Sequence, residues 1–515
     1  MEDHVRAPHL GTSRGALPMT DVDIPGRLAR AAALAGKRPA LLQDGSETSY
    51  PQLLADIELM GQRLASVGLT PGAAFAVLAH NRPEVLVAYY AAARYGYDYV
   101  PLNPSLTARE VTHATVHSRA RLLLHEQELA PVAIAAGGPA QRMEFNQLGR
   151  VEPLRTLQPA RSHDGDFLVI YTSGSTGMPK AVVFSQLAET GGNDSLITMW
   201  KIGPDDRTLV ALPLGFLYGL STAAATSLQA GGSVVLLRRF HPKDTLEALV
   251  RYRATVFHGV PTMYAMMLDY SEASEQRFDL SFLHQLVSAG APLGEELRRR
   301  FERCFNRRID DYYALTEARP IFGRYHDDSR QVPRGSLGRA APGVSARILA
   351  ADGREMAQGE VGELAVRAPG MFTRYDGQPE LTARALAGGE FRTGDLARSD
   401  GDGYYFLMGR IKDIVIRGGA NVGPVEVEEV LTSHPDVRMA AVVGATDATF
   451  GEIVIAFVVG HPEQLPDPAA LLLHCAGRLA SFKVPARIHI LDALPLGPTG
   501  KVDKQKLRAM AEEAA

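Results

Sequence analysis

The stretch "YTSGSTGMPKAVVF" at residues 171–184 combines small hydroxyl-bearing residues and glycines with a lysine. Small residues let a backbone approach a bulky ligand, and successive backbone N–H groups and hydroxyls form a cradle for anionic oxygens. Lys180 adds a positive charge at the end of the stretch. The sequence therefore predicts a phosphate-binding loop here.

This loop differs from the usual phosphate loop, in which the lysine directly follows a glycine and a helix begins. Met178 and Pro179 separate Gly177 from the lysine. The flanking runs "FLVIY" (167–171) and "AVVFS" (181–185) are β-branched and aromatic, so we expect the loop to join two strands. An ordinary Gly/Ser turn is the alternative; the hydroxyl density and the closing lysine favour a phosphate site.

The composition limits the functional classes. The chain has 515 residues, 54 basic and 58 acidic, for a net charge of −4. It is long enough for more than one domain, and its charge does not favour nucleic acid or an anionic membrane as the main partner. Cys304 and Cys475 lie far apart, so we expect two reduced cysteines in or near the core. No apolar run predicts a signal peptide or a membrane span, and we expect a cytoplasmic monomer or homodimer.

Strand-like and helix-like runs alternate over most of the chain, as in 73–80, 82–96, 97–104, 107–118 and 119–126. Such alternation predicts parallel sheets covered by helices.

From about residue 335 the runs become short and β-like, with Gly and Asp turns, which predicts a β subdomain. A smaller α/β unit follows Gly409. We therefore predict an α/β fold with a large N-terminal domain (1–409), which includes the β subdomain, and a small, mobile C-terminal α/β domain (410–515).

Four expected strands end in segments rich in Gly, Pro or polar residues: 212–219, 258–262, 288–294 and 312–318. In open α/β sheets, ligands bind beyond the carboxyl ends of the strands. These segments are therefore candidate site loops, although ordinary strand-to-helix turns also favour Gly and Pro.

Several separated motifs, in order, resemble those of the adenylate-forming superfamily: acyl-CoA synthetases, nonribosomal adenylation domains and beetle luciferases. They are "YTSGSTGMPKAV", "SAGAP", "YYALTEA", "FRTGDL", "GRIKDIVIRGGANVGPVEVE" and "PLGPTGKVDK". The resemblance implies that ATP binds through the phosphate loop and the nucleotide loops. Its nucleotide-binding residues would be Thr172, Ser173, Gly174, Ser175, Gly177, Ala289, Gly290, Ala291, Pro292, Asp311, Tyr312, Tyr313, Ala314 and Thr316.

The resemblance also implies individual roles. Thr176, Lys180, Glu317 and Lys501 would be catalytic, with Lys501 as the adenylation lysine. Glu317 and Thr176 would hold Mg²⁺, which prefers hard oxygen ligands. Asp395 would bind the ribose hydroxyls, Arg410 the ribose or phosphate, and Asp413 would be the hinge of the small domain.

The implied reaction has two steps. A carboxylate attacks the α-phosphate of ATP, pyrophosphate leaves, and a thiol then converts the acyl-adenylate to a thioester and AMP. "RGGANV" resembles acyl-CoA synthetases, in which Gly418 and Gly419 would line a pantetheine tunnel, so we favour CoA as the thiol. A left-handed turn would also explain both glycines. An acyl-carrier protein remains the alternative acceptor.

Two positions depart from the family pattern. Phe216 stands where a gating histidine is common, and Ala314 replaces the glycine of "YGxTE". Together they leave open a third interpretation, an enzyme that has lost adenylation and converts only preformed acyl-adenylates.

The implied acyl pocket contains no carboxylate for an α-amine, which favours a hydrophobic or aryl acid. We expect His258 to be a strand-end histidine with its hydrogen bonds satisfied. The pocket residues are Phe216, Tyr218, His258, Val260, Gly290, Ala314 and Leu315.

Overall fold

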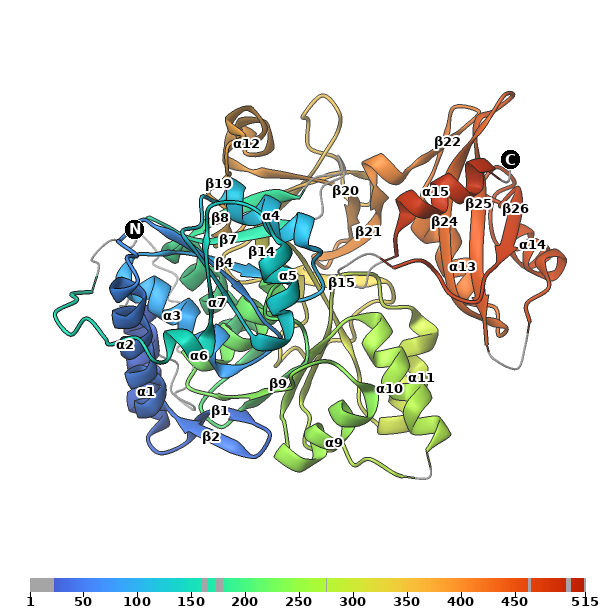
Figure 1. Cartoon of the computed structure of the whole chain (residues 1–515). Helices are drawn as coiled ribbons and strands as arrows, with labels where there is room; N and C mark the ends of the chain where they lie inside the picture. The colour runs from blue at the N-terminus through green and yellow to red at the C-terminus, as the bar shows by residue number, and fades with distance from the viewer. Residues whose placement is uncertain are drawn as a thin grey trace, which may run out of the picture.

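The computed structural model describes residues 23–159, 165–172, 179–274, 276–461, 465–496 and 502–513. Two large sheets and their helices form the main body, and the C-terminal residues, drawn in orange and red in Figure 1, form a smaller body at one side. This arrangement confirms the predicted α/β fold with a large N-terminal and a small C-terminal part.

The first sheet has seven strands and carries the hairpin of the expected phosphate loop. Its apolar runs, such as "AFAVL" at 74–78, are buried throughout, as expected for parallel strands covered on both faces. The strands, in spatial order, are β19 (Arg374–Tyr375), β8 (Lys180–Ser185), β7 (Asp166–Thr172), β4 (Asp98–Leu102), β3 (Ala74–Leu78), β5 (Leu122–His125) and β6 (Gln141–Glu144).

The second sheet has fourteen strands and changes character along its length. One part is largely parallel and contains β13 (Asp310–Leu315), β12 (Gln285–Ser288), β11 (Val256–Gly259), β9 (Arg207–Val210), β10 (Ser233–Leu236), β1 (Pro39–Gln43) and the antiparallel edge strand β2 (Ser46–Ser49).

The other part is antiparallel and contains β16 (Ser345–Leu349), β17 (Gly362–Arg367), β20 (Phe391–Ser399), β21 (Tyr404–Arg410), β15 (Ser336–Ala340), β14 (Ala318–Gly323) and β18 (Gly370–Met371). β14 pairs with β13 and with β15. The short strands expected from residue 335 onward therefore extend the large sheet and do not form a sheet of their own.

Helix α7 (Gln186–Trp200) lies between the large sheets and contacts β7 and β8 of one sheet and β14 and β18 of the other. α3 (Pro83–Tyr95) consists almost wholly of buried residues and packs against α1 (Ile24–Ala35), α2 (Tyr50–Ser66) and β4. The other helices of this body are α4 (Ala108–His117), α5 (Ala130–Ala135), α6 (Phe145–Leu148), α8 (Thr226–Gln229), α9 (Pro242–Tyr252), α10 (Pro261–Ala273), α11 (Glu295–Phe305) and α12 (Pro379–Ala385).

Local sequence explains many helix starts. Proline is the first residue of α3, α9, α10 and α12, a position whose N–H has no helical partner. Thr107 and Glu110 form a capping box at the start of α4. An eight-residue π-helix, Tyr218–Ala225, precedes α8 and includes part of one candidate site loop.

The C-terminal body is built on a five-stranded sheet. Its elements are β22 (Val415–Arg417), β23 (Ala420–Val422), α13 (Pro424–Thr432), β24 (Val437–Asp447), β25 (Gly451–Gly460), α14 (Pro468–Ala476), β26 (Arg487–Ile490) and α15 (Lys504–Glu513). The division at residues 409 and 410 stays a prediction.

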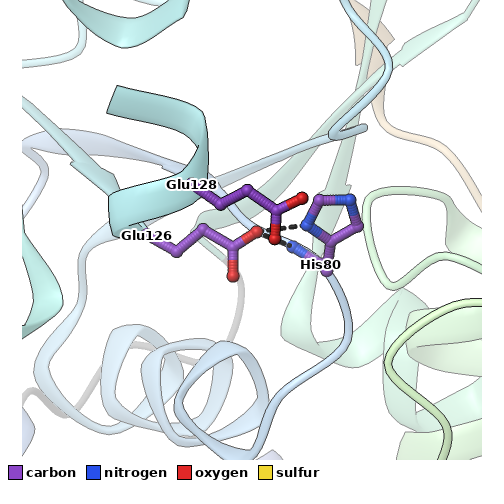
Figure 2. Close-up of side chains that lie close together, drawn as sticks. All are labelled: His80, Glu126 and Glu128. Atoms are coloured by element: carbon purple, nitrogen blue, oxygen red, sulfur yellow. Dashed lines mark hydrogen bonds and ion pairs between the residues drawn. The ribbon is translucent and has the colours of Figure 1, made fainter. Parts of the chain in front are cut away.

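A cluster of ion pairs joins the two large sheets beyond the ends of β3, β5 and β10. His80 contacts Glu126, and Glu128 lies beside them (Figure 2). Arg238 lies 2.9 Å from Glu126 Oε2 and 2.8 Å from Glu128 Oε2, and Arg239 also contacts Glu128.

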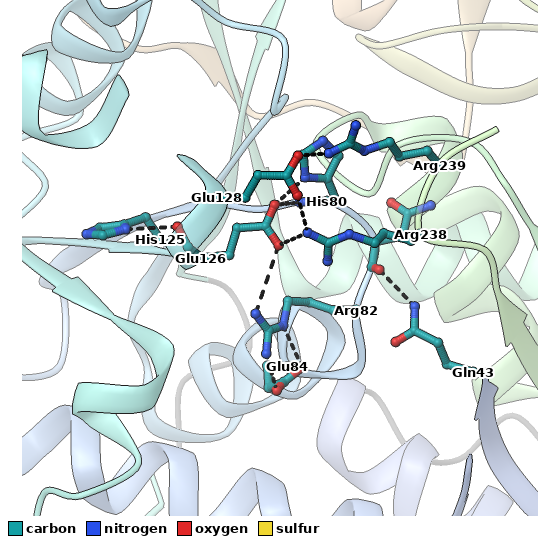
Figure 3. Close-up of polar contacts among 10 residues, drawn as sticks. Gln43, His80, Arg82, Glu84, His125, Glu126, Glu128, Arg238 and Arg239 are labelled. Atoms are coloured by element: carbon teal, nitrogen blue, oxygen red, sulfur yellow. Dashed lines mark hydrogen bonds and ion pairs between the residues drawn. The ribbon is translucent and has the colours of Figure 1, made fainter. Parts of the chain in front are cut away.

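The wider cluster is balanced in charge (Figure 3), because Arg82 adds a third guanidinium and Glu84, 2.6 Å from it, a third carboxylate. His80 and two of these glutamates are close enough to share a metal ion, but the arginines already neutralise the carboxylates. We therefore interpret the cluster as a structural connection between the sheets.

The burial of one of the two cysteines differs from our expectation. Cys475 is buried, but Cys304 is exposed, so the expectation for Cys304 was wrong. Helix α11 buries Phe301 and Phe305, four residues apart on one face, and Cys304 lies outside that face. None of the helices in the described ranges has the length and apolar character needed to cross a membrane.

Candidate functional site

The four candidate loops lie at one edge of the large sheet. β9, β11, β12 and β13 are consecutive neighbours that pair in parallel. Their carboxyl ends therefore lie side by side, and the segments that follow them form the surroundings of a single site.

The ends of the phosphate loop are fixed by the β7–β8 hairpin, in which Thr172 faces Lys180 across the antiparallel pair. The residues between them that we expect to bind phosphate lie outside the described residues, as does Lys501. They are Ser173, Gly174, Ser175, Thr176 and Gly177.

Tyr375 brings two of the expected catalytic residues together. Its hydroxyl donates a hydrogen bond to Glu317 Oε1 at 2.9 Å, and Lys180 Nζ lies 5.3 Å from the centre of its ring. Burial, reinforced by the Glu317 charge, raises the pKa of Tyr375, so its hydroxyl stays protonated and continues to donate. A carboxylate and a cation thus lie close to one aromatic ring beside the phosphate loop.

Asp395 is a buried carboxylate with two partners. Tyr313 donates to Oδ2 at 2.5 Å, and Arg410 Nε lies 2.9 Å from Oδ1. Burial and the Asp395 charge raise the pKa of Tyr313, which keeps this donor protonated. Three residues expected to bind the nucleoside therefore form one connected group.

The remaining nucleotide-loop residues do not all face the same way. Tyr313 and Tyr312 point to opposite faces of β13, and Tyr312 packs against the Trp200 ring at 5.2 Å, away from Asp395. Asp311 forms an ion pair with Arg298 of α11.

The 288–294 loop is more open. Ala289 is buried, Gly290 has a positive φ of +89°, and Gly290, Ala291 and Pro292 are exposed. Thr316, by contrast, is half-buried.

The expected acyl wall is half-buried at Phe216, Tyr218, Val260, Ala314 and Leu315. These side chains are neither solvent-exposed nor sealed in the core, as a ligand-lining wall requires. The Tyr218 hydroxyl lies 3.4 and 3.3 Å from the carbonyls of Gly259 and Val287, either of which can accept its single proton.

His258 differs from its neighbours in this wall and from our expectation. It is 0% exposed, and neither ring nitrogen has a hydrogen-bond partner among the described residues. Its ring lies 5.1 Å from that of Trp200 and 5.7 Å from that of Tyr218. In the part of the chain that the structure describes, no protein group therefore supplies the hydrogen bonds that we expected for this histidine.

Comparison with known proteins identifies the family. The model of the AMP-binding enzyme family matches residues 28–376, and that of the AMP-binding enzyme C-terminal domain matches residues 426–501. The chain belongs to the AMP-binding enzyme family.

Three relatives show the range of this family. The fatty acid–(acyl-carrier-protein) ligase ScoC of Streptomyces coeruleorubidus is 34% identical, over 91% of this chain and 93% of its own length. A feruloyl-CoA synthase of an Amycolatopsis species is 33% identical, over 93% of this chain and 97% of its own. The crystal structure of ATP-bound MatB from Rhodopseudomonas palustris superimposes with a TM-score of 0.87 at 31% identity, over 95% of this chain and 99% of that one.

Family membership makes this chain one of the AMP-forming acid–thiol ligases. In this AMP-binding enzyme the expected hinge residue, Asp413, accepts a hydrogen bond from Arg508 of α15 at 2.9 Å. The same guanidinium donates to the Lys412 carbonyl at 3.1 Å. The C-terminal helix thus contacts the connection between the two bodies directly.

Gly418 and Gly419 form the two-residue turn between β22 and β23, with φ values of +58° and +83°. A turn of this kind favours glycine at both positions, so local geometry alone accounts for them. Two exposed aromatic residues, Phe450 and Phe482, lie close by: a Cβ added at Gly418 would lie 3.5 Å from the Phe450 ring, and Arg417 donates to the Phe482 carbonyl at 3.1 Å.

Sequence reasoning missed two residues that the structure brings into the candidate site. Tyr375 stands in "FTRYDG", and Trp200 ends α7. Neither lies in a recognisable motif, and their proximity to Lys180 and His258 depends on the packing of distant segments. The only available signal for Trp200 was its status as the single tryptophan of the chain.

Proposed function

We propose that this enzyme activates an uncharged hydrophobic or aryl carboxylic acid with ATP and transfers the acyl group to CoA. The observation that carries the proposal is the meeting of the two large sheets at Tyr375, where Lys180 of one sheet and Glu317 of the other lie around one ring, with Asp395 held by Tyr313 and Arg410. The finer roles below rest on the residues' chemistry.

In the first step, the acid's carboxylate must approach the α-phosphate of ATP although both are anionic. Lys180 supplies a positive charge at the phosphate loop, and we propose that Lys501 supplies a second one next to the reacting atoms. The uncharged, half-buried wall limits water around the acyl end. Tyr375 orients Glu317 through its hydrogen bond to Oε1.

The residues present fit a magnesium ion. Glu317 is a half-buried carboxylate; its Oε1 is engaged by Tyr375, and within the described residues no hydrogen bond is made to Oε2. Mg²⁺ prefers such oxygen ligands together with substrate phosphates. When bound, the ion would neutralise developing phosphate charge; Thr176 would be the second protein ligand.

The nucleoside would bind at Asp395. Its carboxylate is buried and ionic, so it can accept hydrogen bonds from the two ribose hydroxyls. Because Arg410 lies against Oδ1, a ribose that binds there would share or displace this guanidinium. Arg410 would then contact the ribose or a phosphate oxygen.

The acid is proposed to be uncharged apart from its carboxylate. Phe216, Tyr218, Val260, Ala314 and Leu315 carry no formal charge. An ammonium group buried among them without a partner would cost several kcal/mol, about enough to exclude α-amino acids.

CoA is proposed as the thiol because of the surroundings of the Gly418–Gly419 turn. Phe450 is 46% and Phe482 39% exposed, so each ring offers a face to a ligand. An adenine ring can stack on such faces, and Arg417, 5.3 Å above the Phe450 ring, offers a charge for phosphate. The aromatic pair therefore favours a nucleotide-bearing thiol over a carrier-protein arm.

Pyrophosphate exchange with a panel of alkyl, aryl and α-amino acids tests the first step. We expect exchange with at least one uncharged hydrophobic or aryl acid and none with amino acids. Thioester formation is then measured with CoA and, separately, with an acyl-carrier protein. Phe450→Ala should raise the KM for CoA without changing the exchange rate, and Phe457→Ala, at a buried position of the same strand region, is the control for damage to the domain.

Transfer to the carrier protein alone would refute CoA as the acceptor and favour the carrier-loading alternative. Thioester formation from a synthetic acyl-adenylate without any exchange would refute adenylation and favour the third interpretation.

A further inference from the structure

The acyl wall encloses a polar side chain whose hydrogen bonds are not made. His258 is fully buried near the carboxyl end of β11, and neither Nδ1 nor Nε2 has a partner among the described residues. A neutral imidazole offers one donor and one acceptor. Buried polar groups in folded proteins are nearly always paired, so two orphaned atoms in one side chain require an explanation.

The surroundings of His258 are aromatic. Trp200 and Tyr218 contact it directly, with ring centres 5.1 and 5.7 Å away, and Tyr312 lies 6.1 Å from Tyr218. Ala314 packs against the same apolar cluster. An acid whose carboxylate lies at Ala314, beside the nucleotide loops, would therefore extend its other end toward His258.

Tyr218 lies against His258 within the acyl wall, and its hydroxyl is weakly held. The two carbonyls that can accept its single proton, those of Gly259 and Val287, lie 3.4 and 3.3 Å away, at the long end of the accepted range. Tyr218 is also the first residue of the π-helix Tyr218–Ala225, a rare conformation that is frequent at functional sites. A small displacement of this ring would bring a ligand atom within reach of the imidazole.

We propose that His258 determines substrate specificity by hydrogen bonding to a hydroxyl group at the end of an aryl acid distant from its carboxylate. This inference rests on the proposed adenylation of an uncharged acid and narrows its class. The three aromatic rings supply edge-to-face partners for an aromatic substrate, and the imidazole supplies the one polar contact.

The neutral state of His258 excludes substrates with a charged group at this end. Burial lowers its pKa to about 3, so the ring is neutral at physiological pH. An ammonium or a second carboxylate on the substrate would be buried beside it without a compensating charge. A hydroxyl both donates and accepts, and it can therefore pair with the ring nitrogen that faces it in either tautomer.

A buried water is the competing explanation. Thr208 and Gln285 flank Val256, two residues before His258 on the same sheet face, and Thr208 Oγ1 and Gln285 Nε2 also have no hydrogen-bond partner among the described residues. A water could bridge such groups. In that case His258 would be structural, and its replacement would affect all acids equally.

Matched pairs of acids separate the two explanations. The pairs are benzoate with 3- and 4-hydroxybenzoate, and cinnamate with 4-hydroxycinnamate. Adenylation is followed by pyrophosphate exchange, and binding by calorimetry with a non-hydrolysable ATP analogue. The wild type should favour the hydroxylated member of at least one pair by about 10- to 100-fold in kcat/KM, because a site built for a hydroxyl rejects the analogue that lacks it.

Three variants test the residue. His258→Phe should lower the rate for the hydroxylated acid and raise that for its partner, so that the ratio falls to within about twofold of unity. His258→Gln, which can still hydrogen bond, should keep part of the preference. His125→Phe replaces another buried strand-end histidine, whose Nδ1 lies 3.1 Å from the Glu126 carbonyl, and should keep the wild-type ratio.

The inference is overturned if the wild type shows no preference in any pair, or if His258→Phe lowers both members equally. It is also overturned if calorimetry detects no binding of either member. Adenylation of the unsubstituted acids without a hydroxyl preference refutes this inference and leaves the proposed function intact. Failure to adenylate any acid, hexanoate included, refutes the proposed function itself.

Discussion

Replacement of Arg319 by methionine should destabilise the large domain more than almost any other single change. Arg319 is 1% exposed and lies in β14, two residues after Glu317. Its guanidinium lies 2.6 Å from Glu189 Oε1 in α7 and donates to Asn193 Oδ1 at 2.9 Å. The ion pair thus connects β14, the strand that follows Glu317, to α7.

The magnitude follows from what the substitution leaves behind. Glu189 is 0% exposed, and without Arg319 its carboxylate would keep only hydroxyl partners, Tyr89 at 2.9 Å and Ser221 at 2.5 Å. A buried charge that loses its partner costs about 3–5 kcal/mol. Replacing both charges with apolar residues removes that penalty, so Arg319→Met with Glu189→Leu should recover about 2–3 kcal/mol relative to the sum of the single changes.

Urea unfolding of the four proteins of this double-mutant cycle measures the coupling. Arg38→Met is the matched control, because Arg38 forms a similar 2.8 Å contact with Asp205 at the surface, with 48% and 91% of the two side chains exposed. That variant should lose about 0–1 kcal/mol. Additive single effects, or a loss below about 1 kcal/mol for Arg319→Met, would refute the reasoning. The KM for MgATP should also rise only in the Arg319 variants, since Glu317 is close by.

Three other changes probe the site. Burial holds the pKa of His258 at about 3, against 6.5 in the unfolded chain, so the unfolded state binds more protons between these two pH values. Acidification from pH 7 to 5 should therefore lower the free energy of unfolding by about 2 kcal/mol. Urea unfolding of His258→Phe should lack this part of the pH dependence. Asp413→Pro fixes φ and deletes the acceptor of Arg508, so adenylation should persist while thioester formation falls; normal overall turnover would exclude Asp413 as the hinge. Ala314→Gly removes a methyl group from the apolar cluster of the acyl wall and should raise pyrophosphate exchange with bulkier acids, whereas an unchanged ranking of short, long and bicyclic acids would place Ala314 outside the pocket.

Most of the fold could be predicted from the sequence because strand and helix patterns are local. Runs such as 73–80 and 82–96 alternate in period and composition, and they correspond to β3 and α3. The continuation of the large sheet from β13 into β14 could not be predicted. Edge pairing depends on which strands meet in space, and a short β-like run carries no record of its partner.

The site shows the same division. Motif residues such as Asp395 and Glu317 could be selected from the sequence, and the order of strands places their loops at one edge. The contacts of these two residues could not be predicted, because Tyr375, which contacts Glu317, and Arg410, which contacts Asp395, come from separate segments. Whether the ring nitrogens of His258 have hydrogen-bond partners depends on every neighbouring atom, so no local sequence pattern could reveal it.

The register of β20 and β21 has a further consequence. Asp395 and Arg410 are partners across this strand pair, and Arg410 is the last residue of β21 before the connection to the C-terminal body. On the proposed function, a ribose bound to Asp395 would displace Arg410, which lies three residues before the hinge predicted at Asp413. Nucleotide binding would then weaken the contact between the large sheet and the segment that leads to the predicted small domain, and the two would be coupled through this one residue pair.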